Sequence, residues 1–196
     1  MRAAAKGRRL RRWWRFCAGR FVLSACAAFI LFCASSPIQA QISSTEEYRL
    51  KLAFLFNFAK FVEWPPDAFP SPQAPLNICI VGRDPFDAEL ERQVAERNLY
   101  GHPVAIRTLR PNDNLGGCHI IFLPASSDGS LPGVLRLLDG SAITVGESAG
   151  FITRGGVLSF LLEGTNLRFT VNLNASQRTR CRISSRFLAL AKIYRE

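Results

Sequence analysis

The sequence lacks most of the short patterns that carry reaction chemistry. It has no C-x-x-C and no H-x-x-x-H spacing and only two histidines, so no metal site is expected. It has no G-x-G-x-x-G and no Walker motif, which leaves nucleotide binding without support. The acidic residues give no candidate carboxylate pair. We therefore expect no metal, no cofactor and no enzymatic activity.

Negative charge is absent from the first 40 residues, which hold eight of the 25 lysines and arginines. Residues 41–196 hold 17 basic and 15 acidic residues, so the net charge of +10 falls to +2 there (17 − 15). A nucleic-acid-binding protein carries its positive charge in the folded part, so this class is excluded. A content of 48% hydrophobic and 20% charged residues also excludes a disordered chain.

Residues 1–40 resemble a cleaved secretory signal peptide. Basic residues continue to Arg20, an apolar stretch covers 21–34, and Ile38-Gln39-Ala40 has the small final residue of a cleavage site. Fourteen apolar residues are fewer than the roughly 20 that a spanning helix needs, which disfavours an uncleaved anchor. We predict export, cleavage after Ala40 and a mature chain in an oxidising space, with Sec and twin-arginine export both open.

Cleavage of the signal peptide would remove three cysteines and would leave Cys79, Cys118 and Cys181 in the mature chain. Any one of three pairings is possible, and each leaves one thiol over. Cys79 lies in one apolar run and Cys118 begins another, and neighbouring strands can bring two Cβ atoms to bonding distance. Three unpaired buried thiols are the alternative.

The hydrophobic pattern predicts an α/β fold for residues 41–196. Helices are expected at 48–64, from Pro85 to near Asn98, in a short segment before Leu138 and at 187–194. Strands are expected at 76–81, about 102–108, 118–123, 142–145, 157–162 and 167–173. This order predicts a single layered domain with a mixed β-sheet of about six strands flanked by helices, and a C-terminal β-hairpin followed by a helix.

Two groups of residues are candidates for a partner or dimer surface. The first helix has a wide aromatic face, which fits either a fully packed core helix or an interaction surface. Arginines near the C-terminus fit either a solvated face or a dock for an acidic partner. The candidate residues are Phe54, Phe56, Phe58, Phe61, Trp64, Arg178, Arg182 and Arg186.

Residues 146–150 match the G-x-S-x-G pattern of a hydrolase nucleophile, with Ser148 at its centre. In that fold the acid and the histidine follow the serine in the chain, whereas His102 and His119 both precede it. No amphipathic helix follows directly either. We therefore expect a turn rather than a catalytic serine.

Several segments together resemble the YfiR family of exported bacterial proteins. They occur in the order of the family across nearly all of 46–196, and the first is the most specific: 48–65, 78–86, 118–123, 144–146, 155–160, 168–172 and 183–185. The resemblance implies a periplasmic, non-catalytic α/β protein, often dimeric. It also implies repression of an inner-membrane diguanylate cyclase through the sensory domain of that enzyme, which lowers cyclic di-GMP.

The resemblance also implies a disulfide between Cys79 and Cys118. A second disulfide of the best-known member has no counterpart, because residues 151–158 contain no cysteine, and Cys181 is expected as a free thiol. The leading hypothesis is a regulator that acts through protein–protein contact: a single domain, clamped by the Cys79–Cys118 bond, presents its aromatic first helix to a second copy or to a membrane sensor. The alternative is an exported protein that binds a small ligand and reports a metabolite to a sensor kinase or receptor.

Overall fold

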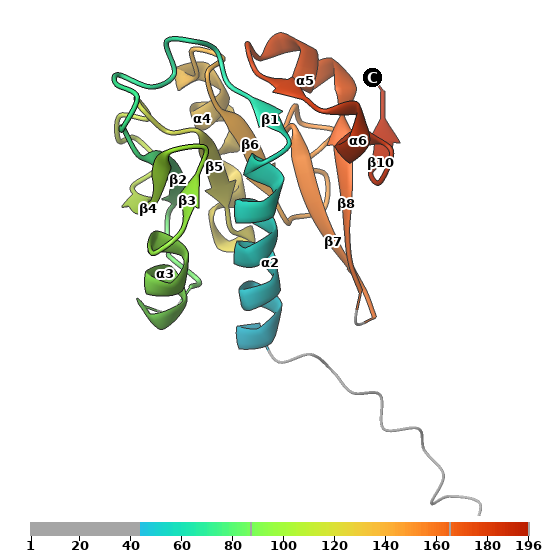
Figure 1. The fold of residues 1–196 in the computed structure, drawn as a ribbon. Helices are drawn as coiled ribbons and strands as arrows, with labels where there is room; N and C mark the ends of the chain where they lie inside the picture. The colour runs from blue at the N-terminus through green and yellow to red at the C-terminus, as the bar shows by residue number, and fades with distance from the viewer. Residues whose placement is uncertain (1–43, 87, 165, 196) are drawn as a thin grey trace, which may run out of the picture. The chain divides into compact units, whose positions relative to one another are not determined.

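The computed structural model describes residues 44–86, 88–164 and 166–195 (Figure 1). The expected signal peptide, its cleavage after Ala40 and the three leader cysteines lie outside the described residues. Within the described part, none of the helices has the length and apolar character needed to cross a membrane.

A mixed sheet forms the centre of the domain. Its strand order is β10-β8-β7-β6-β5-β2-β4-β3. Five neighbouring strands, β7, β6, β5, β2 and β4, run parallel, whereas β8 is antiparallel to β7 and β3 is antiparallel to β4. The bounds are β2 Leu76–Val81, β3 Asn98–Leu99, β4 His102–Leu109, β5 Ile120–Leu123, β6 Ile143–Gly146, β7 Leu158–Glu163, β8 Asn166–Asn172 and β10 Lys192–Tyr194.

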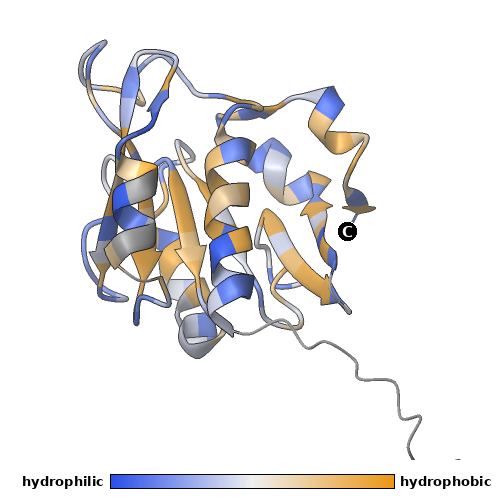
Figure 2. Ribbon diagram, turned by 60° about the horizontal axis from the view of Figure 1, so that its bottom comes forward, coloured by the Kyte–Doolittle hydropathy of each residue, from blue (hydrophilic) through white to orange (hydrophobic). Residues whose placement is uncertain are grey.

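Helices cover both faces of this sheet (Figure 2), which explains why every residue of β5 and β6 is buried. On one face, α2 (Ser44–Ala59) packs against the sheet and beside α3 (Ala88–Ala95). On the other face, α4 (Leu131–Leu137) follows the short 3-10 helix η1 (Ala125–Ser130) and covers a second apolar cluster.

The C-terminal region folds back onto the end of α2. A two-stranded antiparallel sheet joins β1 (Val62–Glu63) to β9 (Arg182–Ile183). The short helices α5 (Leu173–Arg178) and α6 (Ser185–Leu188) flank β9 along the chain, and Phe187 of α6 is buried in the main core. This pairing places segments more than 100 residues apart side by side (Figure 1).

The predicted α/β class, the mixed sheet and the hairpin are confirmed. The main sheet has eight strands rather than about six, because β3 and β10 add short edges. The predicted helix after the hairpin is present but shorter than the expected 187–194: α6 covers Ser185–Leu188, and the chain continues into β10, which pairs parallel to β8. The helix expected from Pro85 begins at Ala88, since Asp84 accepts a hydrogen bond from the amide of Phe86 in a turn.

Candidate functional site

The disulfide between Cys79 and Cys118 is confirmed. It joins β2 to the residue two positions before β5, with Cα atoms 5.8 Å apart, and both cysteines are buried. Cys181 carries a free, buried thiol whose Sγ lies 3.8 Å from the carbonyl oxygen of Gly140. Burial raises the pKa of this thiol to about 12, so it is protonated at neutral pH.

Two of the aromatic residues expected on an interaction surface belong to the core instead. Phe56 and Phe58 are 4% and 1% exposed, which corrects that expectation for both. Phe58 packs against Phe187 of α6, with ring centroids 4.7 Å apart. Phe56 lies beneath the cations of Lys60 and Arg97, which explains how a ring near the polar side of α2 is covered. Phe54, Phe61 and Trp64 are half-buried.

The β1–β9 pair brings part of the two candidate groups together. Glu63 lies opposite Arg182 in the register of this pair, so the segment that includes Phe61 and Trp64 runs beside the first residues after Cys181. Arg178 on α5 and Arg186 on α6 are exposed, as is Arg182. The structure therefore joins Phe61, Trp64 and Arg182 around one region at the end of α2.

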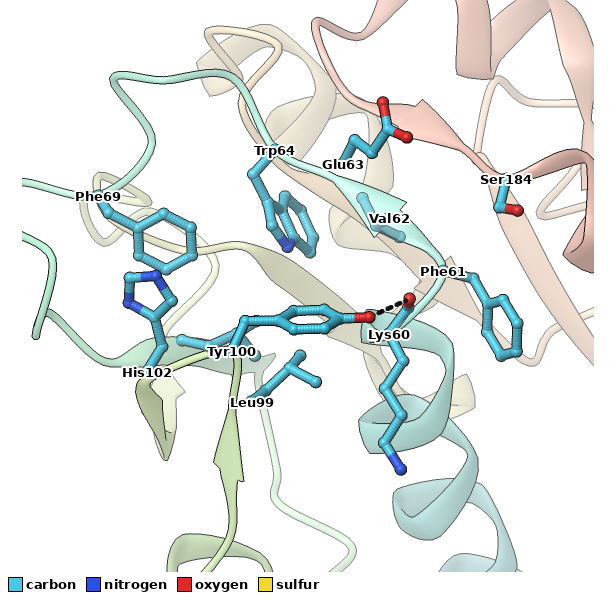
Figure 3. A pocket seen from close by; sticks show the side chains of 11 residues that line it. Lys60, Phe61, Val62, Glu63, Trp64, Phe69, Leu99, Tyr100, His102 and Ser184 are labelled. Carbon is cyan, nitrogen blue, oxygen red and sulfur yellow. Dashed lines mark hydrogen bonds between the residues drawn. The ribbon is translucent and has the colours of Figure 1, made fainter.

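A pocket of about 410 Å³ opens in this region, and we call it the aromatic pocket (Figure 3). The ring of Phe69 stacks on His102 at 3.8 Å and on His119 at 4.2 Å between centroids. Trp64 meets His119 edge-on at 5.4 Å. The pocket is lined by Lys60, Phe61, Val62, Glu63, Trp64, Phe69, Leu76, Leu99, Tyr100, His102 and Ser184.

His119 lies behind this wall with one unmatched polar atom. Its Nδ1 accepts a hydrogen bond from the amide of Asn77, which assigns the proton of the neutral ring to Nε2. Nε2 is buried and makes no hydrogen bond within the described part of the chain. Burial lowers the pKa of His119 to about 4. The backbone of Ala68 has a smaller, opposite effect on this pKa, but it does not complete a hydrogen bond to Nε2. The ring is therefore neutral at pH 7.

Tyr100 lines the aromatic pocket, and its backbone has a strained conformation. It occupies the first position of the two-residue turn between β3 and β4, with φ of 53°, where asparagine or glycine is usual. Its side chain is 77% exposed, and its hydroxyl donates to the carbonyl of Lys60 at the end of α2, at 3.1 Å. A strained backbone that displays a large aromatic ring points to a functional role. Sequence reasoning missed this residue, although the Tyr-Gly dipeptide was a turn signal.

The opposite end of the parallel strands carries charged groups. Lys51 of α2 is 4% exposed and pairs with Glu47 and with Glu147, which follows β6. Glu147 also accepts hydrogen bonds from the hydroxyl of Tyr48 and from the amide of Ala125. Burial, together with the neighbouring Glu147 carboxylate, raises the pKa of Tyr48, so the phenol stays protonated. This cluster ties α2 to the loops after β5 and β6.

Ser148 has a structural role at the same carboxyl end of the parallel strands. Its hydroxyl donates to the carboxylate of Asp128, which also pairs with Arg154. The two histidines lie near the amino ends of β4 and β5, whereas Ser148 follows the carboxyl end of β6, so neither histidine can activate it. The turn seats Phe151 against Gly146, where a Cβ would lie 2.2 Å from the ring. Within the described residues, no three His, Cys, Asp or Glu side chains gather as metal ligands would.

Comparison with known proteins identifies a family that the sequence matches. A family model described as YfiR/HmsC-like matches residues 48–192, which is three quarters of the chain. A search of curated proteins found no match to this chain.

Proposed function

Because the chain belongs to the YfiR/HmsC-like family of periplasmic, non-catalytic regulators of diguanylate cyclases, we propose that it represses one such inner-membrane enzyme by binding its periplasmic sensory domain. Repression of that enzyme would lower the cellular level of cyclic di-GMP. The observation that carries this proposal is the family match over 48–192. Export with cleavage after Ala40 is part of the proposal, and N-terminal sequencing of the periplasmic protein should begin at Gln41.

The aromatic pocket and its rim are the proposed contact surface. Tyr100 offers a large exposed ring, and aromatic residues are enriched where interfaces derive most of their affinity. Arg182 adds positive charge beside the pocket through the β1–β9 pair, and residues 173–195 hold six basic residues and no acidic one. An acidic face on the partner would complement this segment. Repression then follows from tighter binding to the inactive state of the sensory domain.

Cellular cyclic di-GMP provides the test in the native organism. Deleting the gene for this chain should raise cyclic di-GMP, and the intact chain should restore the lower level. Tyr100→Ala should restore it only in part, because the ring is lost while the core is untouched. Leu137→Ala is the matched control, since Leu137 is 54% exposed on α4 and lies away from the pocket. Equal complementation by both variants would remove the aromatic pocket from the contact surface.

A second candidate function is favoured by the volume and lining of the aromatic pocket. About 410 Å³ enclosed by Trp64, Phe69 and His102 is sufficient for a small molecule with a flat apolar part. In this version the chain reports a metabolite to a membrane sensor. Differential scanning of the exported protein against a library of metabolites should show a saturable rise in Tm, and Tyr100→Ala should reduce that rise. Homodimer formation, which the resemblance implies, stays a prediction.

A further inference from the structure

A second pocket lies at the carboxyl ends of the parallel strands, where the order of the sheet reverses. From β2 the chain moves to β4 on one side, then returns to β5 on the other side and continues to β6. In open α/β sheets, ligands bind in the crevice beyond the carboxyl ends of the two strands at which this reversal occurs. Here those two strands are β2 and β5.

The residues that line this pocket come directly after the two strands. Arg83, Asp84, Pro85 and Phe86 follow β2, and Pro124 and Ser126 follow β5. The first turns of α2 complete the lining with Ser44, Thr45 and Tyr48, and the volume is about 400 Å³. We call it the switch-point pocket. It lies at the opposite end of the strands from the aromatic pocket.

Gly82 lets the two turns approach each other closely. Its φ is +100°, and a Cβ at this position would lie 1.8 Å from the hydroxyl oxygen of Ser127. Only glycine allows the turn after β2 to pack against the loop after β5 in this way. This contact fixes the turn that carries Arg83 against the loop after β5.

The charges around the switch-point pocket indicate what it would bind. Asp84 accepts from the amide of Phe86 at 2.8 Å and from the hydroxyl of Thr108 at 2.9 Å, so both its oxygens have donors. Glu147, behind Tyr48, is paired with Lys51. Arg83 is exposed and forms no ion pair with another described residue. Arg83 is therefore the one cationic residue in the described lining of the pocket, whereas Asp84 already has a donor on each of its oxygens.

We propose that the switch-point pocket binds a small polar molecule through an anionic oxygen group, a carboxylate or a phosphate, held by Arg83. Hydroxyls of Ser44, Thr45 and Ser126 supply further donors around that group. The site is separate from the surface proposed for the cyclase, and it is independent of whether the chain represses such an enzyme.

Two-dimensional NMR of the exported protein tests this site with inorganic phosphate and with acetate at constant ionic strength. At least one anion should move the amide signals of Gly82, Arg83 and Ser126 along a saturable curve. Arg83→Gln should weaken that binding about tenfold, because a charge-assisted hydrogen bond is lost. The anion that binds more tightly distinguishes a phosphate source from a carboxylate source.

Arg110→Gln is the matched control, because Arg110 is an exposed arginine beyond the carboxyl end of β4 and does not line the pocket. It should leave the affinity unchanged. Equal weakening by the two variants, linear shifts without saturation for both anions, or shifts confined to Leu99 and Tyr100 would each overturn the proposal. Thermal unfolding of both variants checks that they are folded, and neither exposed side chain contributes to the core.

Discussion

The amino and carboxyl ends of the parallel strands are built from different side chains. At the amino ends of β2, β4 and β5, the rings of Phe69, His102 and His119 stack, and a disulfide holds the segment before β5. At the carboxyl ends, the buried Lys51 pairs with both Glu47 and Glu147, and Glu147 also accepts hydrogen bonds from Tyr48 and Ala125. The polar side chains of this Lys51–Glu147 cluster are hydrogen-bonded, whereas the aromatic end retains a buried N–H and a strained tyrosine.

This contrast suggests a division of roles. A cluster whose polar groups are all paired fixes the position of α2 against the sheet. Unmatched groups and backbone strain persist only where the rest of the fold is stable enough to hold them, and they gather at functional sites. The aromatic end is therefore the better candidate for contact with a partner, and the stability of the fold should depend on both ends in measurable ways.

The largest effect is expected from removal of the disulfide at the aromatic end. Cys79→Ala with Cys118→Ala should lower the free energy of unfolding by about 4 kcal/mol, because the bond closes a loop with a sequence separation of 39 residues. Urea unfolding measures this change, and signalling should be released in cells. Cys181→Ala is the control, with a smaller expected loss. The appearance of three free thiols in the folded exported protein would contradict the bond.

At the charged end, Glu147→Ala should cost about 3 kcal/mol, since it leaves the buried Lys51 with Glu47 alone and removes the acceptor of the Tyr48 hydroxyl and the Ala125 amide. Lys51→Met in the same chain should recover part of the loss, because the uncompensated charge is then removed. Urea unfolding of the two single variants and the double variant gives the coupling energy. Additive losses would show that the pair does not act as a unit.

Acidification should destabilise the aromatic end through His119. Its pKa is about 4 in the folded protein and about 6.5 unfolded, so the unfolded state binds more protons as the pH falls below 6.5. The free energy of unfolding should fall by about 2 kcal/mol between pH 7.5 and pH 5 from this residue alone. His119→Gln should show a shallower pH dependence over the same range. Identical slopes for the two proteins would place the acid sensitivity elsewhere.

The smallest effect on stability has the opposite sign. Tyr100→Asn should raise the free energy of unfolding by roughly 0.5 to 1 kcal/mol, because asparagine adopts positive φ more readily. Tyr100→Phe keeps the strain and loses the hydrogen bond to Lys60, so it should not stabilise. Thermal unfolding distinguishes the two variants. A loss of stability in Tyr100→Asn would mean that the ring is held for packing.

The sequence was sufficient for the layered fold and for the central strands, because continuous apolar runs and the hairpin signal at 163–166 are local patterns. It did not predict β10 or β3, which are two or three residues long and form only because a neighbouring strand is in place. The burial of Lys51 was also out of reach, since Glu147 is 96 residues away in the chain.

The candidate surface was only partly predictable for the same reason. Helical periodicity shows that α2 is aromatic, but it does not show that Phe187 of α6 covers Phe58. The resemblance supplied the disulfide pairing, which cysteine spacing alone left open. Tyr100 was missed because its significance lies in its conformation and in its place beside α2.

The most direct test of repression by this chain is the level of cyclic di-GMP in cells that lack it, with the intact chain or Tyr100→Asn supplied from a plasmid. The level should rise on deletion, return with the intact chain, and return only in part with the variant even though that variant folds more stably. An unchanged level on deletion would contradict the proposed repression of a diguanylate cyclase.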